Sequence, residues 1–90
     1  MAKRALVSYR GNVQGVGFRY TASSMAGRFR VAGFVKNITD GSVELVAEGE
    51  EGEILAFLEA LDERMGVLVE SKEIRWSEAT GEFRGFGIRF

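Results

Sequence analysis

The 90-residue sequence contains no cysteine and no histidine. Without cysteine, the chain can form no disulfide, and it has neither a thiolate nucleophile nor a thiolate metal ligand. Without histidine, it also lacks the usual general base, a phosphohistidine nucleophile and the commonest zinc ligand. Any catalysis must therefore rely on other side chains or on the backbone.

Proline is also absent, and no apolar run approaches the ~20 residues of a membrane-spanning helix. The basic start, Met1–Arg4, is not followed by a long apolar segment or a small-residue cleavage site, so it does not resemble a signal peptide. We therefore expect a cytoplasmic protein. The length, the 46% hydrophobic content and the lack of a linker or repeat predict one globular domain over residues 1–90.

Acidic residues are missing from residues 1–39, although the whole chain contains 13. The basic residues of this stretch are Lys3, Arg4, Arg10, Arg19, Arg28, Arg30 and Lys36. This asymmetry favours an anionic partner, unless folding interleaves the two halves into a surface of mixed charge. The net charge of -1 and the pI of about 5.5 argue against nucleic acid as that partner.

Hydrophobic periodicity predicts an α+β fold. The predicted elements are a strand at 5–10, a helix at 18–29, strands at 33–38 and 42–48, a helix at 51–65, and strands at 71–77 and 86–90. The Asp40-Gly41 pair predicts a hairpin between the second and third strands. This βαββαβ order, with a short C-terminal strand, favours a ferredoxin-like α/β sandwich in which both helices cover one face of an antiparallel sheet.

An acidic run and four aromatic residues are expected to have structural roles. The acidic run Glu48–Glu53 is interpreted as a helix N-terminus with solvated neighbours. Aromatic residues at periodic positions are expected in the core or on a sheet face, and they are Phe57, Trp76, Phe86 and Phe90.

The stretch GNVQGVGFR at residues 11–19 lies between the first strand and the first helix. A glycine loop that leads into a helix N-terminus can bind an anion, because successive backbone N–H groups converge there. It matches neither the nucleotide P-loop nor the dinucleotide fingerprint. Arg19, in the first helical turn, could grip two phosphate oxygens. Alternatively, the glycines only form a tight turn and Arg19 is a solvated surface residue.

This stretch resembles the first acylphosphatase signature, and GFVKNITDGSV at residues 33–43, closing at Gly49, resembles the second. Both occur in the expected order and spacing, and the resemblance extends to the C-terminal residues 86–90. One departure is Arg30, just past the first helix, where the family often has glycine.

The resemblance implies hydrolysis of an acyl phosphate to a carboxylate and inorganic phosphate. It implies that Asn37 orients the attacking water, although Asn37 alone would be interpreted as a strand-end residue bonded to the turn. It implies that Arg19 and the loop amides hold the phosphoryl group, the loop residues being Gln14, Gly15, Val16, Gly17, Phe18 and Arg19. The expected partners are a small acyl phosphate as substrate and inorganic phosphate as product and inhibitor. We expect no nucleic acid, membrane, metal or cofactor. The protein is expected to be a monomer.

Elementary chemistry agrees with that implication. A carboxylate leaving group has a conjugate-acid pKa of roughly 4, so it needs no general acid. Phosphoryl transfer depends mainly on positioning and charge stabilisation. Asp40, the first acidic residue, is expected to form the hairpin, since one aspartate is a poor magnesium site. The alternatives are a non-catalytic module that binds phosphate or acyl phosphate, a domain that serves a carbamoyl-phosphate enzyme, and an RNA-binding domain.

Overall fold

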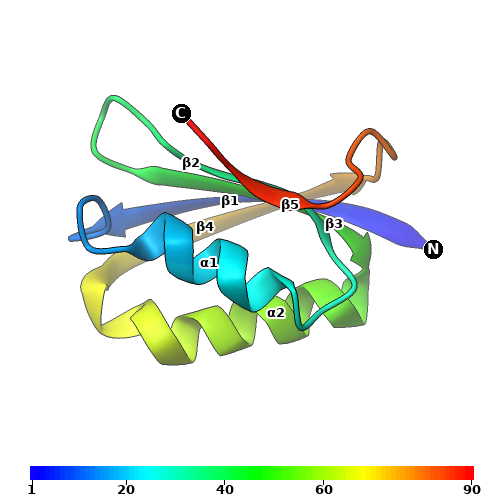
Figure 1. Cartoon of the computed structure of the whole chain (residues 1–90), viewed down its shortest axis with the longest axis horizontal. Coiled ribbons are helices and arrows are strands. Elements are labelled where there is room, and N and C mark those ends of the chain that lie inside the picture. The colour runs from blue at the N-terminus through cyan, green and yellow to red at the C-terminus, as the bar shows by residue number, and fades with distance from the viewer.

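The computed structural model describes residues 1–90 as a two-layer α+β sandwich (Figure 1). The strands are β1 (Ala2–Gly11), β2 (Ala32–Asn37), β3 (Val43–Glu50), β4 (Val69–Glu78) and β5 (Phe86–Arg89). The helices are α1 (Phe18–Ala26), α2 (Glu51–Met65) and a short 3₁₀ turn, η1 (Gly66–Leu68). Neither α-helix is long and apolar enough to cross a membrane.

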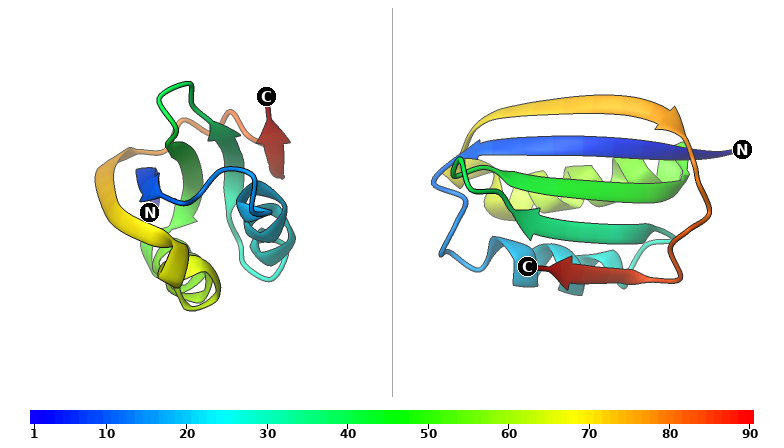
Figure 2. Two further views of the ribbon diagram at one scale, coloured as in Figure 1. Left: turned by 90° about the vertical axis from the view of Figure 1, so that its left-hand side faces the viewer. Right: turned by 90° about the horizontal axis from the view of Figure 1, so that it is seen from above.

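The strands form one sheet in the order β4-β1-β3-β2-β5, with α1 and α2 on the same face (Figure 2). The predicted ferredoxin-like fold is confirmed, and its four main strands pair antiparallel. The fifth strand, β5, pairs parallel with β2, so the complete sheet is mixed. The strands β4 and β2 run in opposite directions. Because the chain reverses its direction after β4, β5 runs in the same direction as β2.

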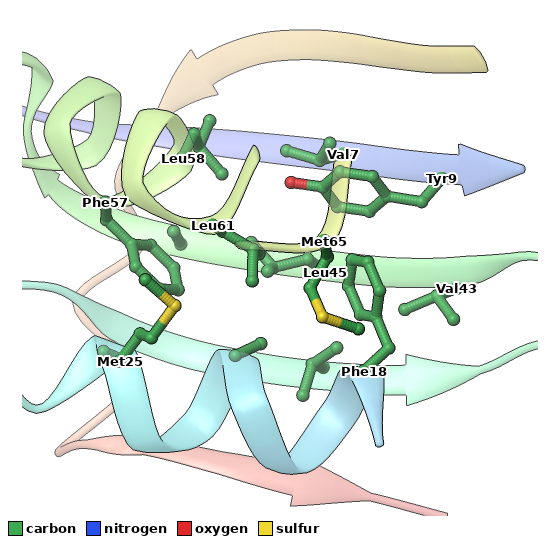
Figure 3. Packing of buried hydrophobic residues seen from close by; sticks show 14 of the residues in the cluster. Val7, Tyr9, Phe18, Met25, Val43, Leu45, Phe57, Leu58, Leu61 and Met65 are labelled. Carbon is green, nitrogen blue, oxygen red and sulfur yellow. The ribbon is translucent and has the colours of Figure 1, made fainter. Parts of the chain in front are cut away.

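The core lies between the sheet and the two helices, as Figure 3 shows. Alternate residues of β1 and β3 face the helices and are fully buried, namely Ala5, Val7, Tyr9, Val43, Leu45 and Ala47. From the helices, Phe18 contacts Tyr9 with ring centroids 4.8 Å apart, and Phe57 is fully buried. The Tyr9 hydroxyl has no hydrogen-bond partner, and burial, reinforced by the charge of Asp62, raises the pKa of that phenol well above its ordinary value.

The first helix is shorter than its apolar periodicity predicts. It ends at Ala26, and the next turn continues with tighter bonds in which the N–H groups of Arg28 and Phe29 donate to residues three positions back. Phe29 still packs on Phe57, at a centroid distance of 5.9 Å, which explains why its position fits the helical pattern. Arg30 needs no left-handed conformation, and its N–H donates to Glu53 Oε1 at 2.8 Å.

Glu48 is buried, contrary to the prediction of a solvated acidic run. Its carboxylate accepts hydrogen bonds from the backbone N–H groups of Thr80 and Gly81, from the Thr80 hydroxyl, and from Arg4 at 3.0 Å. Burial alone would raise the pKa of Glu48, but these donors outweigh it and lower the pKa to about 2. Glu48 thus fastens the β4–β5 connection to the sheet.

Two aromatic residues are more exposed than predicted. Trp76 lies on β4, an edge strand, and is 41% exposed, whereas Phe90 is 93% exposed beyond the end of β5. Of the four aromatic residues expected in the core or on a sheet face, Phe57 is fully buried and Phe86 packs against the core.

Candidate active site

Three segments that are distant in sequence meet at one end of the molecule (Figure 1). They are the glycine loop between β1 and α1, the end of β2 with its hairpin, and the end of β5. The register pairs Lys36 of β2 with Arg89 of β5, so these parallel strands end side by side. The fold therefore brings the two signature segments and the C-terminal strand together.

The glycine loop leaves a series of backbone donors free. Gly15 and Gly17 have φ angles of 74° and 81°, a left-handed conformation that non-glycine residues rarely adopt. None of the backbone N–H groups from Gln14 to Arg19 donates to an acceptor within the protein. Since the last of these groups begin α1, the helix dipole adds to their positive potential. We call this series of free N–H groups, from Gln14 to Arg19, the cradle.

Arg19 extends from the first turn of α1 toward the end of β5. Its Nη1 lies 3.5 Å from the carbonyl oxygen of Arg89, and its guanidinium carbon lies 4.9 Å from the ring centroid of Phe90. No carboxylate lies within ion-pair distance of Arg19. Its charge is therefore available to an anion in the cradle.

Two of the six other basic residues in the stretch 1–39 are neutralised by folding. Arg4 pairs with Glu48 at 3.0 Å, and Arg10 pairs with Asp40 at 3.3 Å. The charge asymmetry of the sequence is thus partly interleaved, as the alternative interpretation expected, but Arg19 is not included in that neutralisation.

Asn37 is the last residue of β2 and lies opposite Val43 of β3. The buried Val35 lies two positions earlier, so Asn37 projects from the sheet face that carries the helices. Its half-buried side chain makes no hydrogen bond within the protein, and it does not bond to the turn. The amide is therefore free to bind a water molecule or a ligand at the end of β2.

The side chain of Gln14 connects the cradle to the hairpin. Its Nε2 donates to the carbonyl oxygens of Ile38 at 2.7 Å and Ser42 at 2.9 Å. From the sequence, only the backbone N–H of Gln14 is expected at the site. One feature of the sequence indicates a role for the side chain itself. Gln14 is a long polar residue with two amide hydrogens, and the other residues between 13 and 17 are glycine and valine.

Asp40 stabilises the hairpin, as predicted. Its Oδ1 accepts hydrogen bonds from the Ser42 hydroxyl at 2.6 Å and from the Ser42 N–H at 2.9 Å. These hydrogen bonds, with a smaller contribution from Arg10, lower the pKa of Asp40 below its ordinary value. Gly41 has a φ of 94°, which completes the tight turn.

The cradle is a surface feature, and the one distinct hollow of the molecule lies elsewhere. That hollow, of about 250 Å³, is lined by Ser8, Arg10, Ser71, Lys72 and Glu73, from β1 and β4. No group of three or more histidine, cysteine, aspartate or glutamate side chains is placed to hold a metal ion. The fold is a small α+β domain, and the free N–H groups of the glycine loop lie beside an arginine that has no carboxylate partner.

Comparison with known proteins identifies that domain. The family model described as Acylphosphatase matches residues 5–88. An acylphosphatase of Geotalea uraniireducens is 41% identical over 91 residues, and the match covers all of both chains. An acylphosphatase of Salinibacter ruber is 41% identical over 88 residues, and the match covers 97% of this chain and 93% of the relative. The chain belongs to the acylphosphatase family, and it is a hydrolase that acts on acyl phosphate bonds.

Solved structures agree with this assignment. The crystal structure of an acylphosphatase from Bacillus subtilis matches with a TM-score of 0.85 and 33% identity over the whole of both chains. Full-length HypF, in a phosphate- and nucleotide-bound form, matches with a TM-score of 0.90 and 28% identity. All of this chain is covered in that match, but only 12% of HypF, so the same fold also occurs as one part of a much longer protein.

Proposed function

We propose that the cradle binds the phosphoryl group of an acyl phosphate and that Asn37 orients a water molecule for direct attack on phosphorus. The observation that carries the proposal is the set of free N–H groups from Gln14 to Arg19 beside an arginine that has no carboxylate partner. Such donors are arranged before the substrate arrives, so they stabilise developing negative charge without reorganisation.

The ground state and the transition state use different groups in this mechanism. The loop amides and Arg19 bind the phosphoryl oxygens, with the planar guanidinium able to contact two of them. Asn37, which is free of other hydrogen bonds, holds the attacking water. Its contribution is therefore made mainly as the water approaches phosphorus.

The bond changes need no general acid from the protein. The water oxygen forms a bond to phosphorus, the bond between phosphorus and the bridging oxygen breaks, and the carboxylate leaves with the electron pair. A proton of the water passes to a phosphate oxygen of the substrate, which gives inorganic phosphate as the second product. Because a carboxylate has a conjugate-acid pKa of roughly 4, it is a good leaving group without protonation.

Hydrolysis of an aromatic acyl phosphate in H₂¹⁸O containing EDTA tests this mechanism. We expect the anhydride to be consumed, with the label incorporated into phosphate and none in the carboxylate. Activity should survive the chelator, and rapid quenching should trap no phosphorylated protein. Label in the carboxylate, or a stable phosphoenzyme, would contradict direct attack of water on phosphorus.

A non-catalytic module that binds phosphate is the second interpretation, because the cradle alone would suffice for binding. The free side chain of Asn37 favours the enzyme, since a phosphate sensor has no need of a group that orients water. Tight binding of inorganic phosphate without hydrolysis of any acyl phosphate would favour the module.

We propose further that the protein acts as a monomer. The exposed edge strand β4 carries Glu70, Lys72, Glu73, Arg75 and Glu78 along its length. Charged side chains on an edge strand oppose pairing with another sheet. Light scattering should give a mass near 9.9 kDa, and twice that mass would contradict the proposal.

A further inference from the structure

The side chain of Gln14 joins the two halves of the site. Its Nε2 lies 2.7 Å from the Ile38 carbonyl oxygen and 2.9 Å from the Ser42 carbonyl oxygen, and both contacts are partly buried. A primary amide has two hydrogens on nitrogen, so both donors of Gln14 are used. The contact spans 24 residues of sequence to Ile38 and 28 residues to Ser42.

The two acceptors belong to the turn that follows Asn37 directly. The N–H of Ile38 donates to the Ser42 carbonyl oxygen at 2.9 Å, and the N–H of Gly41 donates to the Ile38 carbonyl oxygen at 3.1 Å. Each carbonyl therefore accepts one bond from the turn and one from Gln14. The glutamine therefore contacts both ends of the turn, one directly after β2 and one directly before β3.

Few other side chains could make this pair of contacts. Glutamate has no donor above its pKa and would place negative charge against two carbonyl oxygens. Asparagine has the same amide, but its side chain is shorter by one methylene group. Leucine approximates the shape and removes both hydrogen bonds. These differences allow the role of the amide to be separated from the role of side-chain volume.

We propose that Gln14 is a positioning residue that sets the separation between the phosphate cradle and Asn37. This inference rests on the proposed function, in which the cradle holds the phosphoryl group and Asn37 holds the attacking water. The Gln14 amide itself is not a catalytic group, because both of its N–H donors are occupied and its remaining oxygen cannot donate to an anion. Its effect on the reaction passes through the placement of Asn37.

The first test compares turnover with phosphate binding. Gln14→Leu should lower kcat by about 10- to 100-fold, since a displacement of about 1 Å is enough to misalign an attacking group. The inhibition constant of inorganic phosphate should change less than about twofold, because the loop amides and Arg19 remain. Thr39→Ala, an exposed change in the same hairpin, is the matched control and should leave both values unchanged.

The second test is a double-mutant cycle. If Gln14 acts through Asn37, then adding Gln14→Leu to the Asn37→Ala variant should lower kcat by less than about threefold. If the fold-loss in kcat of the double variant equals the product of the losses in the two single variants, the proposal is overturned. A parallel fall in phosphate affinity and kcat would also overturn it, since Gln14 would then serve the cradle alone.

A pH measurement keeps the proposal testable if Gln14→Leu does not fold. In Gln14→Glu, the protonated acid can donate one hydrogen bond, whereas the carboxylate can donate none. The kcat of this variant relative to the parent protein should therefore rise as the pH falls through the pKa of the new carboxyl group. A ratio that is independent of pH contradicts the proposal. An inactive parent protein would instead contradict the proposed function.

Discussion

The guanidinium carbon of Arg19 lies 4.9 Å from the ring centroid of Phe90, the last residue of the chain, although the two residues are far apart in the sequence. The neighbouring carbonyl oxygen of Arg89 lies 3.5 Å from the Arg19 Nη1. The end of β5 therefore contacts the arginine and leaves its charge without a carboxylate partner. The arginine is oriented by groups that do not neutralise it.

Removal of that charge should abolish most of the activity. Arg19→Ala is expected to lower kcat/KM by about 10³-fold or more, since an arginine on a transferring phosphoryl group contributes on that scale. Inhibition by inorganic phosphate should weaken as well, whereas the urea midpoint should be nearly unchanged because no ion pair is lost. Lysine should rescue poorly, because a point charge cannot reproduce a planar contact with two oxygens.

Arg28→Ala provides the matched control for Arg19. Arg28 is exposed just after the same helix, and its side chain makes no hydrogen bond or ion pair. Its kinetic constants should equal those of the parent protein. Near-normal activity of Arg19→Ala would show that the phosphate site lies elsewhere.

Asn37→Ala should separate catalysis from binding. We expect kcat to fall by about 10²-fold, the scale of one lost transition-state hydrogen bond, while phosphate still inhibits at nearly the parental concentration. Asn37→Asp should weaken substrate binding as well, because it places a negative charge beside the phosphoryl group. Asn12→Ala alters the other asparagine at this end of the molecule and should have no effect.

Two outcomes for Asn37→Ala would revise its role. Equal losses of phosphate affinity and turnover would make Asn37 a phosphate ligand. Unchanged kinetics would remove Asn37 from the mechanism.

Glu48 should make folding stability depend on acid. Its pKa of about 2 in the folded protein lies below the ordinary value of 4.5, so the ionised carboxylate stabilises the fold above pH 4.5. This stability is lost as the pH falls from 4.5 toward 2. At 1.36 kcal/mol per pKa unit, the difference corresponds to about 3 kcal/mol.

Urea unfolding across pH 2 to 7 measures this contribution. Glu48→Gln should lower the free energy of unfolding at pH 7 by up to about 3 kcal/mol and should flatten its fall between pH 4.5 and 2. Glu59→Gln, on the exposed face of α2, should do neither. If Glu48→Gln keeps the acid dependence of the parent protein, another carboxylate is responsible.

Two glycine substitutions should have opposite effects on stability. Gly33 has a φ of 151°, and a Cβ atom there would lie 1.8 Å from the Val46 carbonyl oxygen, so Gly33→Ala should cost more than about 3 kcal/mol or prevent folding. Gly52 lies in the first turn of α2 with open space around it, so Gly52→Ala should add about 0.5–1 kcal/mol. Thermal unfolding of both variants distinguishes them.

The spacing of apolar residues predicts a helix or strand well where one face of that element is buried along its whole length. The second helix spans Glu51–Met65 as predicted, because Ile54, Leu61 and Met65 all face the core. The apolar spacing predicts a longer first helix than the structure contains, because Phe29 enters the core from a turn and keeps the helical spacing. The sequence does not predict the parallel pairing of β5, since the direction of a four-residue strand depends on the connection before it.

Local sequence locates the cradle but not the contacts that fix it. The spacing of glycines beside Arg19 predicts an anion site, and the structure leaves those N–H groups free. The roles of Gln14 and Glu48 depend on acceptors and donors 24 to 44 residues away, which no local pattern contains. The catalytic roles of Arg19 and Asn37 stay predictions until their variants are measured.

The direction of β1 places the N-terminus far from the cradle (Figure 1). Ala2 pairs with Glu50 at one end of the sheet, and Gly11 enters the glycine loop at the other. A strand of 10 residues spans about 30 Å at about 3.3 Å per residue. A reporter, affinity tag or solid support joined ahead of Met1 should therefore leave the cradle facing solution, and immobilised protein should keep the turnover of the free form.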